Sequence, residues 1–549
     1  MKHRADYRLL TRQLELMHLL RIGEQQAAFV QAVFMGVAGA AAVMLFEAGC
    51  TAVQGSLTGL WGSRVACFSV LPPLWRVLLP CLGAVAAALV LLAAHRVDKR
   101  AIPDYMEAFS LGDGKLPRRQ GLLRSISAVL SLGTGACIGK EGALMQIAAV
   151  AASAVGRWLH VSPHRLRLMV GCGAAAGMTA AFHTPLAACL FVSEVVVGSL
   201  SIGYLAPLLL ASCAAYSLVW CMGEGGALFP CASSVTDGAQ LLFCLAAAAL
   251  LAPLAKLWVA WLNLARLLFS GKLSWLVFRM AAAGLLVGAV SVYQPAIVGN
   301  GQEAIAAVLA SSFSLPDAAV LLGLKALLVA IVFGVGTMGG VLTPTLMIGC
   351  FGGWCFGTAV GADSPETLAL VGMAAFFAAA ARTPVTALLL VVELSMNASL
   401  IFPIMAAVAV SYALSRYLPG RTLYDSAHAE HTPLLVRDIM LRHPAQLHEG
   451  ADMNTLRRLA LHHPNLPIPL VDEEGRYVSL LNPLAENPIT PPVLAPEDTP
   501  AQALRLFEKS PQNDWLPVVQ ESRILGLVSR VELYQTIALL FRRELAKRR

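Results

Sequence analysis

Residues 131–143 read SLGTGACIGKEGA and place Glu141 between glycines inside a long apolar stretch. A carboxylate in such surroundings is costly unless it lines a polar cavity or has a function, so it is a functional hypothesis by default. The flanking Gly139 and Gly142 let the backbone approach an ion closely. We expect a helix over residues 143–155, whose free N–H groups and positive dipole end favour a bound anion or the Glu141 carboxylate itself. The alternative is that Glu141 only caps this helix.

A second glycine-rich segment, GGVLTP at residues 339–344, has the features of another helix start. Its proline lies close to the first turn of a helix expected over residues 345–356, a position that proline favours. The amides of Val341 and Leu342 then have no intrahelical partner and can meet an ion from the opposite side. Alone this motif is weak, since a Gly-Gly break often serves only close packing, but it complements Glu141.

Residues 181–194 and 380–393 resemble each other. Each segment runs from a Thr-Pro pair through apolar residues to a glutamate at the same spacing, Glu194 in the first and Glu393 in the second. Duplicated halves of this kind are common in transporters, where the substrate site lies at the interface of the halves near the bilayer midplane. The alternative is a chance likeness between two Ala-rich helices.

The composition is that of a membrane protein. Of 549 residues, 57% are hydrophobic and 13% are charged, which lies outside the usage of soluble domains. Apolar stretches that are long enough to cross hydrocarbon as helices lie near residues 27–47, 73–95, 125–160, 168–222, 239–262, 275–295 and 318–417. Several contain Gly or Pro, which lipid tolerates where protein or a watery cavity satisfies the freed backbone groups. We predict an all-α polytopic membrane protein with two repeated halves and broken helices.

The segments outside these stretches set further limits. Residues 1–26 are basic and amphipathic and lack the apolar core and cleavage site of a signal peptide, so we expect a cytoplasmic N-terminal helix. A net charge of +7 is modest, and nucleic-acid binding is not expected. The 12 cysteines are scattered without metal-ligand spacing, so we expect them to act as small hydrophobes and predict no metal site.

The composition becomes polar and rich in His and Pro after about Tyr424. We therefore predict a membrane domain at residues 27–424 and a small cytoplasmic α/β domain at residues 425–549. A helix is expected to begin at Asp498-Thr499-Pro500, because a capping residue followed by Pro is a sound helix start. Strands are predicted at residues 466–472, 516–519 and 524–528.

These motifs resemble those of the CLC family of chloride channels and chloride/proton antiporters. Residues 139–143 are similar to the family's G-K/R-E-G-P loop, residues 340–344 to its G-x-F-x-P loop, and Leu423-Tyr424 to the tyrosine that closes the inner end of its pore. The tail resembles a pair of CBS modules, the first of them abbreviated. The resemblance implies a homodimer in the lipid bilayer with one pore per subunit, which passes chloride or a similar small anion and requires no cofactor.

The resemblance also implies roles for single residues. Glu141 becomes the gating glutamate, and the residues that bind the anion become Gly139, Lys140, Gly142, Val341, Leu342 and Tyr424. One departure concerns Arg100, which stands where the family has a serine that contacts the anion. Arg100 either supplies a cationic inner mouth or snorkels to the cytoplasmic surface, and both interpretations stay open.

A second departure concerns protons. Many exchangers of the family carry two successive glutamates where this chain has Glu194 and then Val195. Valine carries no proton, so the internal proton-transfer position is lost, which favours a gated channel over a chloride/proton antiporter of the same fold. Adjacent helical residues point about 100° apart, so Glu194 is expected to face away from the path that Val195 would serve. A third departure, Ala143 for the usual Pro, is expected only to loosen the helix start.

In CBS modules an acidic residue after a Ser or Thr on the last strand can hold a nucleotide ribose, and here these residues are Ser529 and Glu532. The usual acid is Asp, so the tail either binds an adenine nucleotide or has a structural or dimer-stabilising role.

Other functional classes find less support. A cation-coupled solute transporter predicts several paired intramembrane acids, whereas here the membrane acids are few, and a membrane-anchored sensor leaves Glu141 unexplained. An enzyme is not expected, because no nucleophile, base and orienting group occur together. Short loops and the missing signal peptide fit a bacterial inner membrane, with both termini in the cytoplasm.

Overall fold

The structure is a computed structural model that describes residues 24–97, 105–110, 114–159, 161, 163–197, 202–231, 235, 237–424, 435–442, 444–451, 466–481, 488–531 and 533–534. It divides into two compact units. The transmembrane unit contains the described residues up to Tyr424, except those of Glu107–Lys115 and Val161–Arg167. These two segments belong with the described residues from 435 onward to the smaller unit. Residues 1–23 of the predicted N-terminal helix lie outside the described part.

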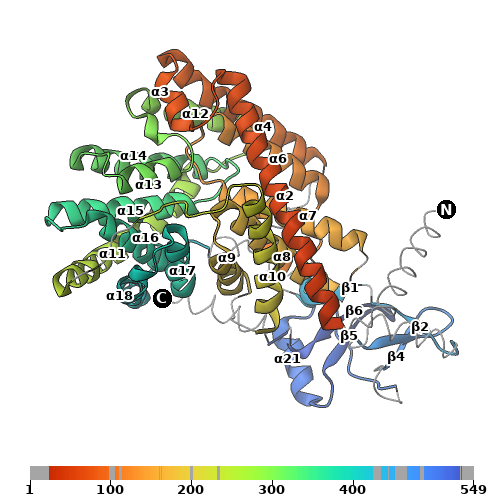
Figure 1. Cartoon of the computed structure of the whole chain (residues 1–549). Helices are drawn as coiled ribbons and strands as arrows, with labels where there is room; N and C mark the ends of the chain where they lie inside the picture. Colours follow the sequence, from red (N-terminus) through yellow and green to blue (C-terminus); the bar gives the residue numbers. More distant parts are fainter. Residues whose placement is uncertain are drawn as a thin grey trace. The chain divides into compact units, whose positions relative to one another are not determined.

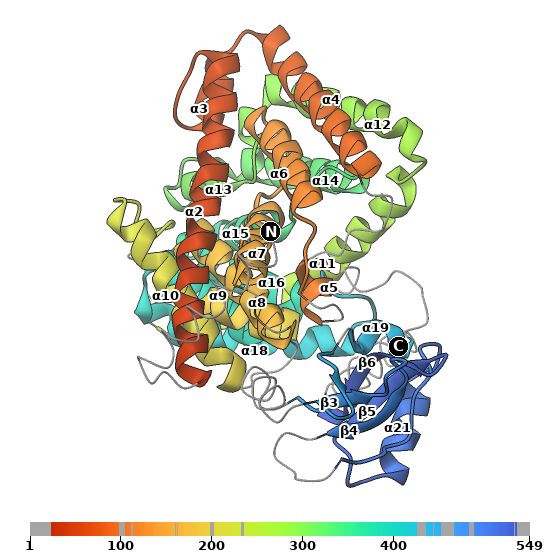
Figure 2. The same ribbon diagram turned by 90° about the vertical axis from the view of Figure 1, so that its right-hand side faces the viewer.

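The first half of the transmembrane unit is helical throughout (Figure 1). The elements of this part of the chain are α2 (Glu24–Thr58), α3 (Arg64–Val70), α4 (Pro73–Val97), α5 (Tyr105–Ser110), α6 (Arg118–Gly133), α7 (Glu141–Trp158), α8 (Pro163–Phe182), α9 (Pro185–Phe191), the π-helix η1 (Val192–Val197) and α10 (Ile202–Cys221). The end of α5 from Glu107 and the start of α8 up to Arg167 belong to the smaller unit. Helix α10 packs along α2, as Figures 1 and 2 show.

The second half is also helical. Its elements are α11 (Gly238–Phe269), η2 (Leu273–Trp275), α12 (Leu276–Tyr293), η3 (Pro295–Ile297), α13 (Gln302–Leu309), α14 (Leu315–Gly334), α15 (Leu342–Ala359), α16 (Pro365–Ala381), α17 (Pro384–Ser395), η4 (Ala398–Leu400) and α18 (Ile401–Tyr417). Among the described residues, seven helices are long and apolar enough to cross a membrane. They are Ala28–Thr58, Pro73–Val97, Tyr204–Cys221, Gly238–Phe269, Leu273–Tyr293, Leu315–Gly334 and Ala398–Tyr417. The predicted all-α polytopic class is confirmed.

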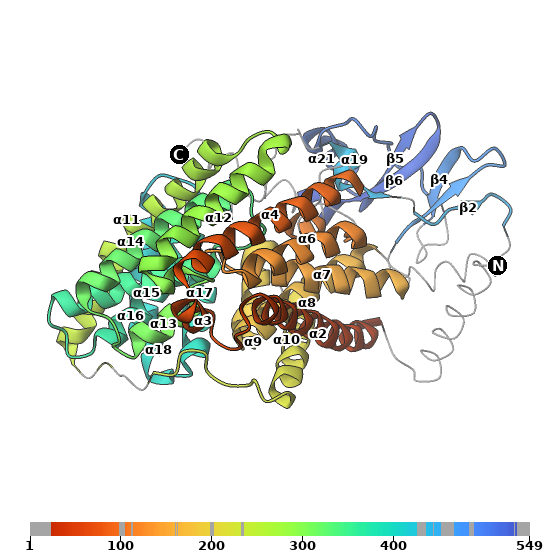
Figure 3. The same ribbon diagram turned by 90° about the horizontal axis from the view of Figure 1, so that it is seen from above.

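Equivalent residues of the two halves share unusual backbone φ angles. Gly135 and Gly336 both have positive φ, 96° and 95°, at equivalent places in the two glycine-rich segments. His183 and Arg382, which are not glycines, also have positive φ, 59° and 57°. Each of these two residues ends a long helix just before a Thr-Pro pair begins a short one. The predicted duplication is therefore confirmed, and Figure 3 shows the two halves side by side.

The centre of the second half consists of two helices in backbone contact, α15 and α16 (Figure 1). Helix α16 is buried along its whole length after the first turn, as expected for a helix that is apolar on every side. A Cβ atom on Gly372 of α16 would lie 2.6 Å from the carbonyl oxygen of Gly349 in α15. Small residues therefore set this contact, as is usual between helices in lipid.

Helices α4 and α12 also pack through glycine, and they lie alongside each other in Figures 2 and 3. Gly284 and Gly288 in α12 are four residues apart, and a Cβ on Gly284 would lie 2.5 Å from the carbonyl oxygen of Pro80 in α4. This spacing brings both glycines to one helix face. It links the first half of the transmembrane unit to the second.

Two predicted helix starts are wrong by two or three residues. Helix α7 begins at Glu141, not at residue 143, and α15 begins at Leu342, not at residue 345. Gly142 belongs to α7 and not to the loop that the sequence predicts. It faces the backbone of Gly339: a Cβ atom on Gly142 would lie 3.3 Å from the Gly339 carbonyl oxygen. Close packing of the backbone, rather than a loop conformation, favours a glycine here.

The smaller unit contains two three-stranded sheets. Strands β1 (Leu441–Arg442), β6 (Arg523–Ser529) and β5 (Trp515–Gln520) are antiparallel neighbours in that order. Strand β2 (Leu447–His448) runs parallel to β3 (Ile468–Val471), which pairs in antiparallel fashion with β4 (Tyr477–Leu481). The three predicted strands are thus confirmed as β3, β5 and β6. Among the described residues from 435 onward, two helices accompany these sheets, α19 (Val436–Ile439) and α21 (Pro500–Lys509).

The predicted start of α21 is confirmed. Thr499 is its capping residue, the Thr499 side chain accepts from the N–H of Gln502, and the Gln502 side chain accepts from the N–H of Thr499. This reciprocal pair is a capping box. Helix α21 then buries Ala503 and Phe507 against β5 and β6 in one apolar cluster.

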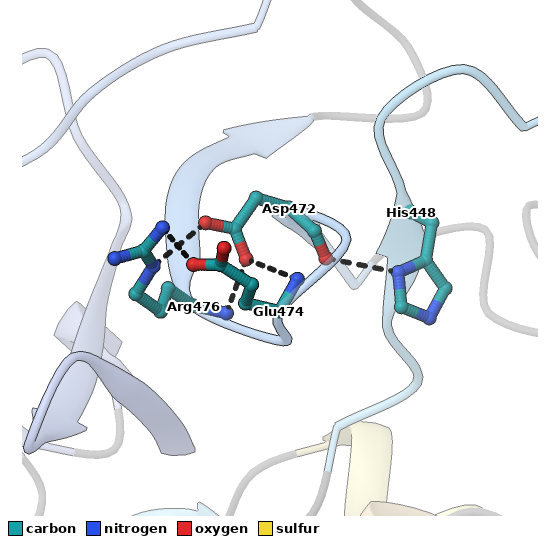
Figure 4. A network of polar contacts seen from close by, with 4 residues as sticks. All are labelled: His448, Asp472, Glu474 and Arg476. Atoms are coloured by element: carbon teal, nitrogen blue, oxygen red, sulfur yellow. Dashed lines mark hydrogen bonds and ion pairs between the residues drawn. The ribbon is translucent and has the colours of Figure 1, made fainter.

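The turn from β3 to β4 is held by one aspartate, as Figure 4 shows. Asp472 Oδ1 accepts from the N–H groups of Glu474 (3.0 Å) and Arg476 (2.8 Å), and Oδ2 pairs with Arg476 Nε at 2.9 Å. Arg476 also pairs with Glu474, and the ring nitrogen Nδ1 of His448 lies 3.1 Å from the Asp472 carbonyl oxygen. The N–H and guanidinium of Arg476 hold the pKa of Asp472 below its ordinary value.

Candidate functional site

The two glycine-rich segments meet through their backbones. The N–H of Gly139 donates to the carbonyl oxygen of Gly340 at 2.8 Å, and the N–H of Gly340 donates to that of Gly139 at 2.7 Å. Such a reciprocal pair relates the segments by a local two-fold axis. In this conformation the Gly139 amide is engaged with protein, and its part in anion binding stays a prediction. The bridge makes Gly139 equivalent to Gly340, and Glu141 equivalent to Leu342.

The Glu141 carboxylate lies at the start of a helix that belongs to the other half. Glu141 is the first residue of α7 and is 2% exposed. Its Oε1 accepts a hydrogen bond from the hydroxyl of Thr343, the second residue of α15. Its Oε2 has no hydrogen-bond partner among the described residues and lies beside Gly340, where a Cβ would be 3.0 Å away. Thr343 was not singled out from the sequence, because no local signal links residues 202 positions apart.

The start of α15 is therefore a place for negative charge. Val341 is the residue before the helix and Leu342 is its first residue, both buried. The first amides of a helix have no intrahelical acceptor, and the helix dipole adds a positive potential there. Both features favour an anion or a carboxylate.

The ammonium group of Lys140, the residue before α7, is not available to a ligand at the start of α15. Its ammonium forms an ion pair with Glu47 of α2, and the two side chains are 13% and 33% exposed. The sequence reasoning missed Glu47, although a glutamate inside an apolar helix is itself a signal for a buried partner. Lys140 therefore acts in this conformation as part of a neutral pair.

Tyr424 is half-buried near the end of the transmembrane unit, and its hydroxyl oxygen is buried. Its hydroxyl makes no hydrogen bond within the described part of the chain. Its ring meets the ring of Phe191 edge to face, with centroids 5.4 Å apart and planes at 82°. The preceding residue is held by a hydrogen bond of 2.9 Å from the N–H of Leu423 to the carbonyl oxygen of Ala380. A buried hydroxyl without a protein partner is available to a ligand.

Comparisons with known proteins agree with these features. The family model described as voltage gated chloride channel matches residues 82–416, which is more than half of the chain. The chain belongs to the CLC family. A CBS domain model matches residues 488–538. A putative chloride channel protein, ClcB-like, of Ralstonia nicotianae is 33% identical over 75% of this chain and 97% of its own length.

Solved CLC structures share the fold. A slow cyanobacterial Cl-/H+ antiporter superposes with a TM-score of 0.64 at 21% identity, covering 73% of this chain and 96% of the antiporter. A eukaryotic CLC transporter superposes with a TM-score of 0.62 at 17% identity, covering 94% of this chain and 98% of the transporter. The predicted resemblance to the CLC family is confirmed. Of the predicted pair of CBS modules, the CBS domain model matches one, at residues 488–538.

Other residues predicted from the CLC resemblance lie away from the start of α15 or outside the described part of the chain. Glu194 and Val195 lie in the π-helix η1 that continues α9. Glu194 Oε2 accepts from the N–H (3.0 Å) and the hydroxyl (2.7 Å) of Thr386 at the start of α17. The angle of about 100° assumed for an α-helix therefore does not apply to this turn. Val195 is half-buried and has no ionisable group.

Arg100 lies outside the described residues, as does Glu532, so both assignments stay predictions. Ser529, the proposed neighbour of Glu532, is the last residue of β6 and is buried. Within the described part of the chain, no group of three or more His, Cys, Asp and Glu side chains is arranged to hold a metal ion.

Proposed function

We propose that this CLC protein passes chloride or a similar small anion across the membrane and that Glu141 is its gate. The carboxylate and the anion compete for the start of α15, where Val341, Leu342 and Thr343 supply the amides and the hydroxyl. When the carboxylate is protonated or swings away, an anion takes its place, because a helix start favours either negative charge. Tyr424 offers its hydroxyl to the anion at the inner end of the same path.

The observation that carries the proposal is that the buried Glu141 carboxylate has a hydrogen-bond partner for only one of its two oxygens among the described residues. It lies in the half opposite to the helix it meets, one oxygen has no partner among the described residues, and the equivalent residue Leu342 has no charge. A buried carboxylate that is only half satisfied is poorly stabilised where it lies. Such a group is suited to exchange with a ligand.

We further propose uncoupled conduction. Val195 offers no proton acceptor, and the neighbouring Glu194 has its carboxylate engaged with Thr386. The alternative is a chloride/proton antiporter of the same fold, and the superposed cyanobacterial protein is itself described as an antiporter. In that case a proton has to reach Glu141 by another route, for instance through Glu194 or a chain of waters.

Reconstituted protein with a chloride electrode and a pH electrode separates these two mechanisms. A channel gives chloride flux without stoichiometric proton movement, and its reversal potential follows the chloride gradient alone. An exchanger has a fixed ratio of ions to protons, so a pH gradient has to shift its reversal potential. A shift that disappears in Glu194→Gln would contradict the channel proposal and identify Glu194 as the internal proton acceptor.

The assembly and the tail complete the proposal. As for other CLC proteins, we propose a homodimer with one pore per subunit in a bacterial inner membrane, with both termini in the cytoplasm. Native mass spectrometry measures the assembly against the 58.0 kDa of one chain. Adenine-nucleotide binding near Ser529 is the remaining proposal, and a titration with ATP that leaves the melting temperature unchanged would count against it.

A further inference from the structure

Two glutamates at equivalent places in the two halves hold the starts of each other's helices. Glu393, near the end of α17, accepts from the N–H of Leu186 at 3.0 Å and from the N–H of Ala187 at 2.7 Å, both in the first turn of α9. Glu194, just after α9, accepts from the N–H and the hydroxyl of Thr386 in the first turn of α17. The end of each helix thus meets the start of the other, so α9 and α17 pack as an antiparallel pair.

The residues that would ordinarily cap these helices do not do so. Thr184 and Thr383 precede α9 and α17 with nearly the same backbone angles, φ −122° and −121°. Neither side chain caps its own helix, and within the described residues neither hydroxyl has a hydrogen-bond partner. Threonine is a favoured capping residue, so the carboxylates from the opposite half have taken over this function.

The helix held in this way carries the residue that packs against Tyr424 of the proposed pore. Phe191 is the last residue of α9, is fully buried, and forms the edge-to-face contact with Tyr424. Glu393 holds the first turn of α9, and Glu194 holds the π-turn that follows Phe191. Helix α9 is therefore fixed at both ends against α17.

We propose that Glu194 and Glu393 form a carboxylate clamp that positions Phe191 against Tyr424 and thereby sets the inner end of the anion path. This inference rests on the proposed function, because it assigns the clamp a role in anion affinity. The clamp residues are positioning residues and do not touch the anion. Glu194 and Glu393 act on the anion path through α9, a helix with defined contacts at each end.

Glu393→Gln in the reconstituted full chain tests the clamp. An amide side chain keeps one acceptor oxygen but presents N–H groups to the second helix amide, so one of the two hydrogen bonds is lost. We expect the apparent chloride affinity to weaken by about threefold to tenfold, which is the usual size of the effect of a residue that does not touch the ligand itself. The maximal rate should change less than the affinity.

Glu303→Gln is the matched control. Glu303 also receives hydrogen bonds at the start of a helix, from the hydroxyl of Ser63 and the N–H groups of Arg64 (2.9 Å) and Val65 (3.0 Å). That helix, α3, packs chiefly against η3, whereas α9 packs against α10, α17 and η1. We expect chloride affinity in Glu303→Gln to stay at the wild-type value. Equal losses in both variants would mean that any lost helix cap weakens transport, and would overturn the clamp.

A double-mutant cycle makes the coupling specific. Combining Glu393→Gln with Phe191→Leu should weaken chloride affinity by less than the product of the two single effects, because both act on the same contact. Glu303→Gln combined with Phe191→Leu should give the simple product. A simple product for Glu393 as well would show that Glu393 does not act through Phe191.

Hydrogen exchange separates failure of the clamp from failure of the proposed function. If the wild type carries no anion, the proposed function is wrong, but the amides of Leu186 and Ala187 should still exchange faster in Glu393→Gln than in wild type. Unchanged exchange would overturn the clamp whatever the transport result. If Glu393→Gln does not fold, Thr386→Val removes only the hydroxyl that donates to Glu194 and should give a smaller loss of affinity in the same direction.

Discussion

At the scale of residues, four glutamates in the described part of the transmembrane unit accept hydrogen bonds at helix starts of the opposite half: Glu141, Glu194, Glu303 and Glu393. Glu194 and Glu393 form a reciprocal pair, so releasing one helix start loosens both ends of an antiparallel helix pair. Glu141 has no such counterpart, because Leu342 stands at the equivalent position. Its carboxylate can therefore leave without disturbing a second contact, as a gate requires.

Glu141→Gln should raise anion flux by about twofold to tenfold, because a negative charge at a helix N-terminus contributes on the order of 0.3 to 2 kcal/mol. The amide cannot titrate, so the variant should also lose most of the pH dependence that the carboxylate gives the wild type. Chloride efflux from proteoliposomes at pH values on both sides of the ordinary carboxyl range measures both effects.

Thr343→Val is the companion variant for Glu141. It removes the hydroxyl that donates to the carboxylate but leaves the titratable group in place. We expect the pH dependence to be retained, in contrast to Glu141→Gln. A folded Glu141→Gln protein without flux would contradict the gating role.

At the scale of elements, the contact between α15 and α16 is set by backbone atoms. Gly372→Val places a side chain where the carbonyl oxygen of Gly349 lies 2.6 Å and the Cα of Gly353 lies 2.8 Å from the new Cβ. We expect the free energy of unfolding to fall by about 1 to 3 kcal/mol, the usual effect of overpacking. A lower melting temperature in detergent measures this loss. Gly323→Val in α14 is the control, because nothing lies within 4 Å of a Cβ there. Equal melting temperatures for the two variants would refute this account of the α15–α16 contact.

The turn between β3 and β4 should depend on pH through Asp472. Its pKa is lower in the folded chain than the ordinary value of 3.8, so its stabilising effect is complete above that value. The effect is lost as the pH falls through the lowered pKa. We expect the amides of Glu474 and Arg476 to lose protection against hydrogen exchange in that acid range, after correction for intrinsic rates. Asp472→Asn should lower this protection already at neutral pH, and a variant with wild-type protection would contradict the role of the carboxylate.

At the scale of the whole molecule, the transmembrane unit is one arrangement used twice, and the two copies differ at the candidate site. The paired positive φ angles at Gly135 and Gly336, and at His183 and Arg382, repeat the backbone of one half in the other. The bridge between Gly139 and Gly340 joins the halves at their centre. Only a difference between the halves can distinguish one side of this bridge from the other, and Glu141 against Leu342 is such a difference.

Much of this molecule follows from local properties of the chain. Hydropathy determines that the chain lies in a membrane, because transfer of a long apolar segment into lipid depends on that segment alone. The Thr-Pro starts of α9 and α17 and the capping residue Thr499 are also local, and the two Thr-Pro segments revealed the duplication. The motif around Glu141 identified the centre of the site for the same reason.

The partners of these residues were decided by the tertiary structure. Thr343 and Glu141 are 202 positions apart, Thr386 and Glu194 are 192 apart, and Leu186 and Glu393 are 207 apart. The contact of Gly142, near the start of α7, with Gly339 is of the same kind, because it joins two segments far apart in the sequence. The energy of such contacts belongs to two segments at once and depends on how the halves are oriented, which no stretch of sequence contains.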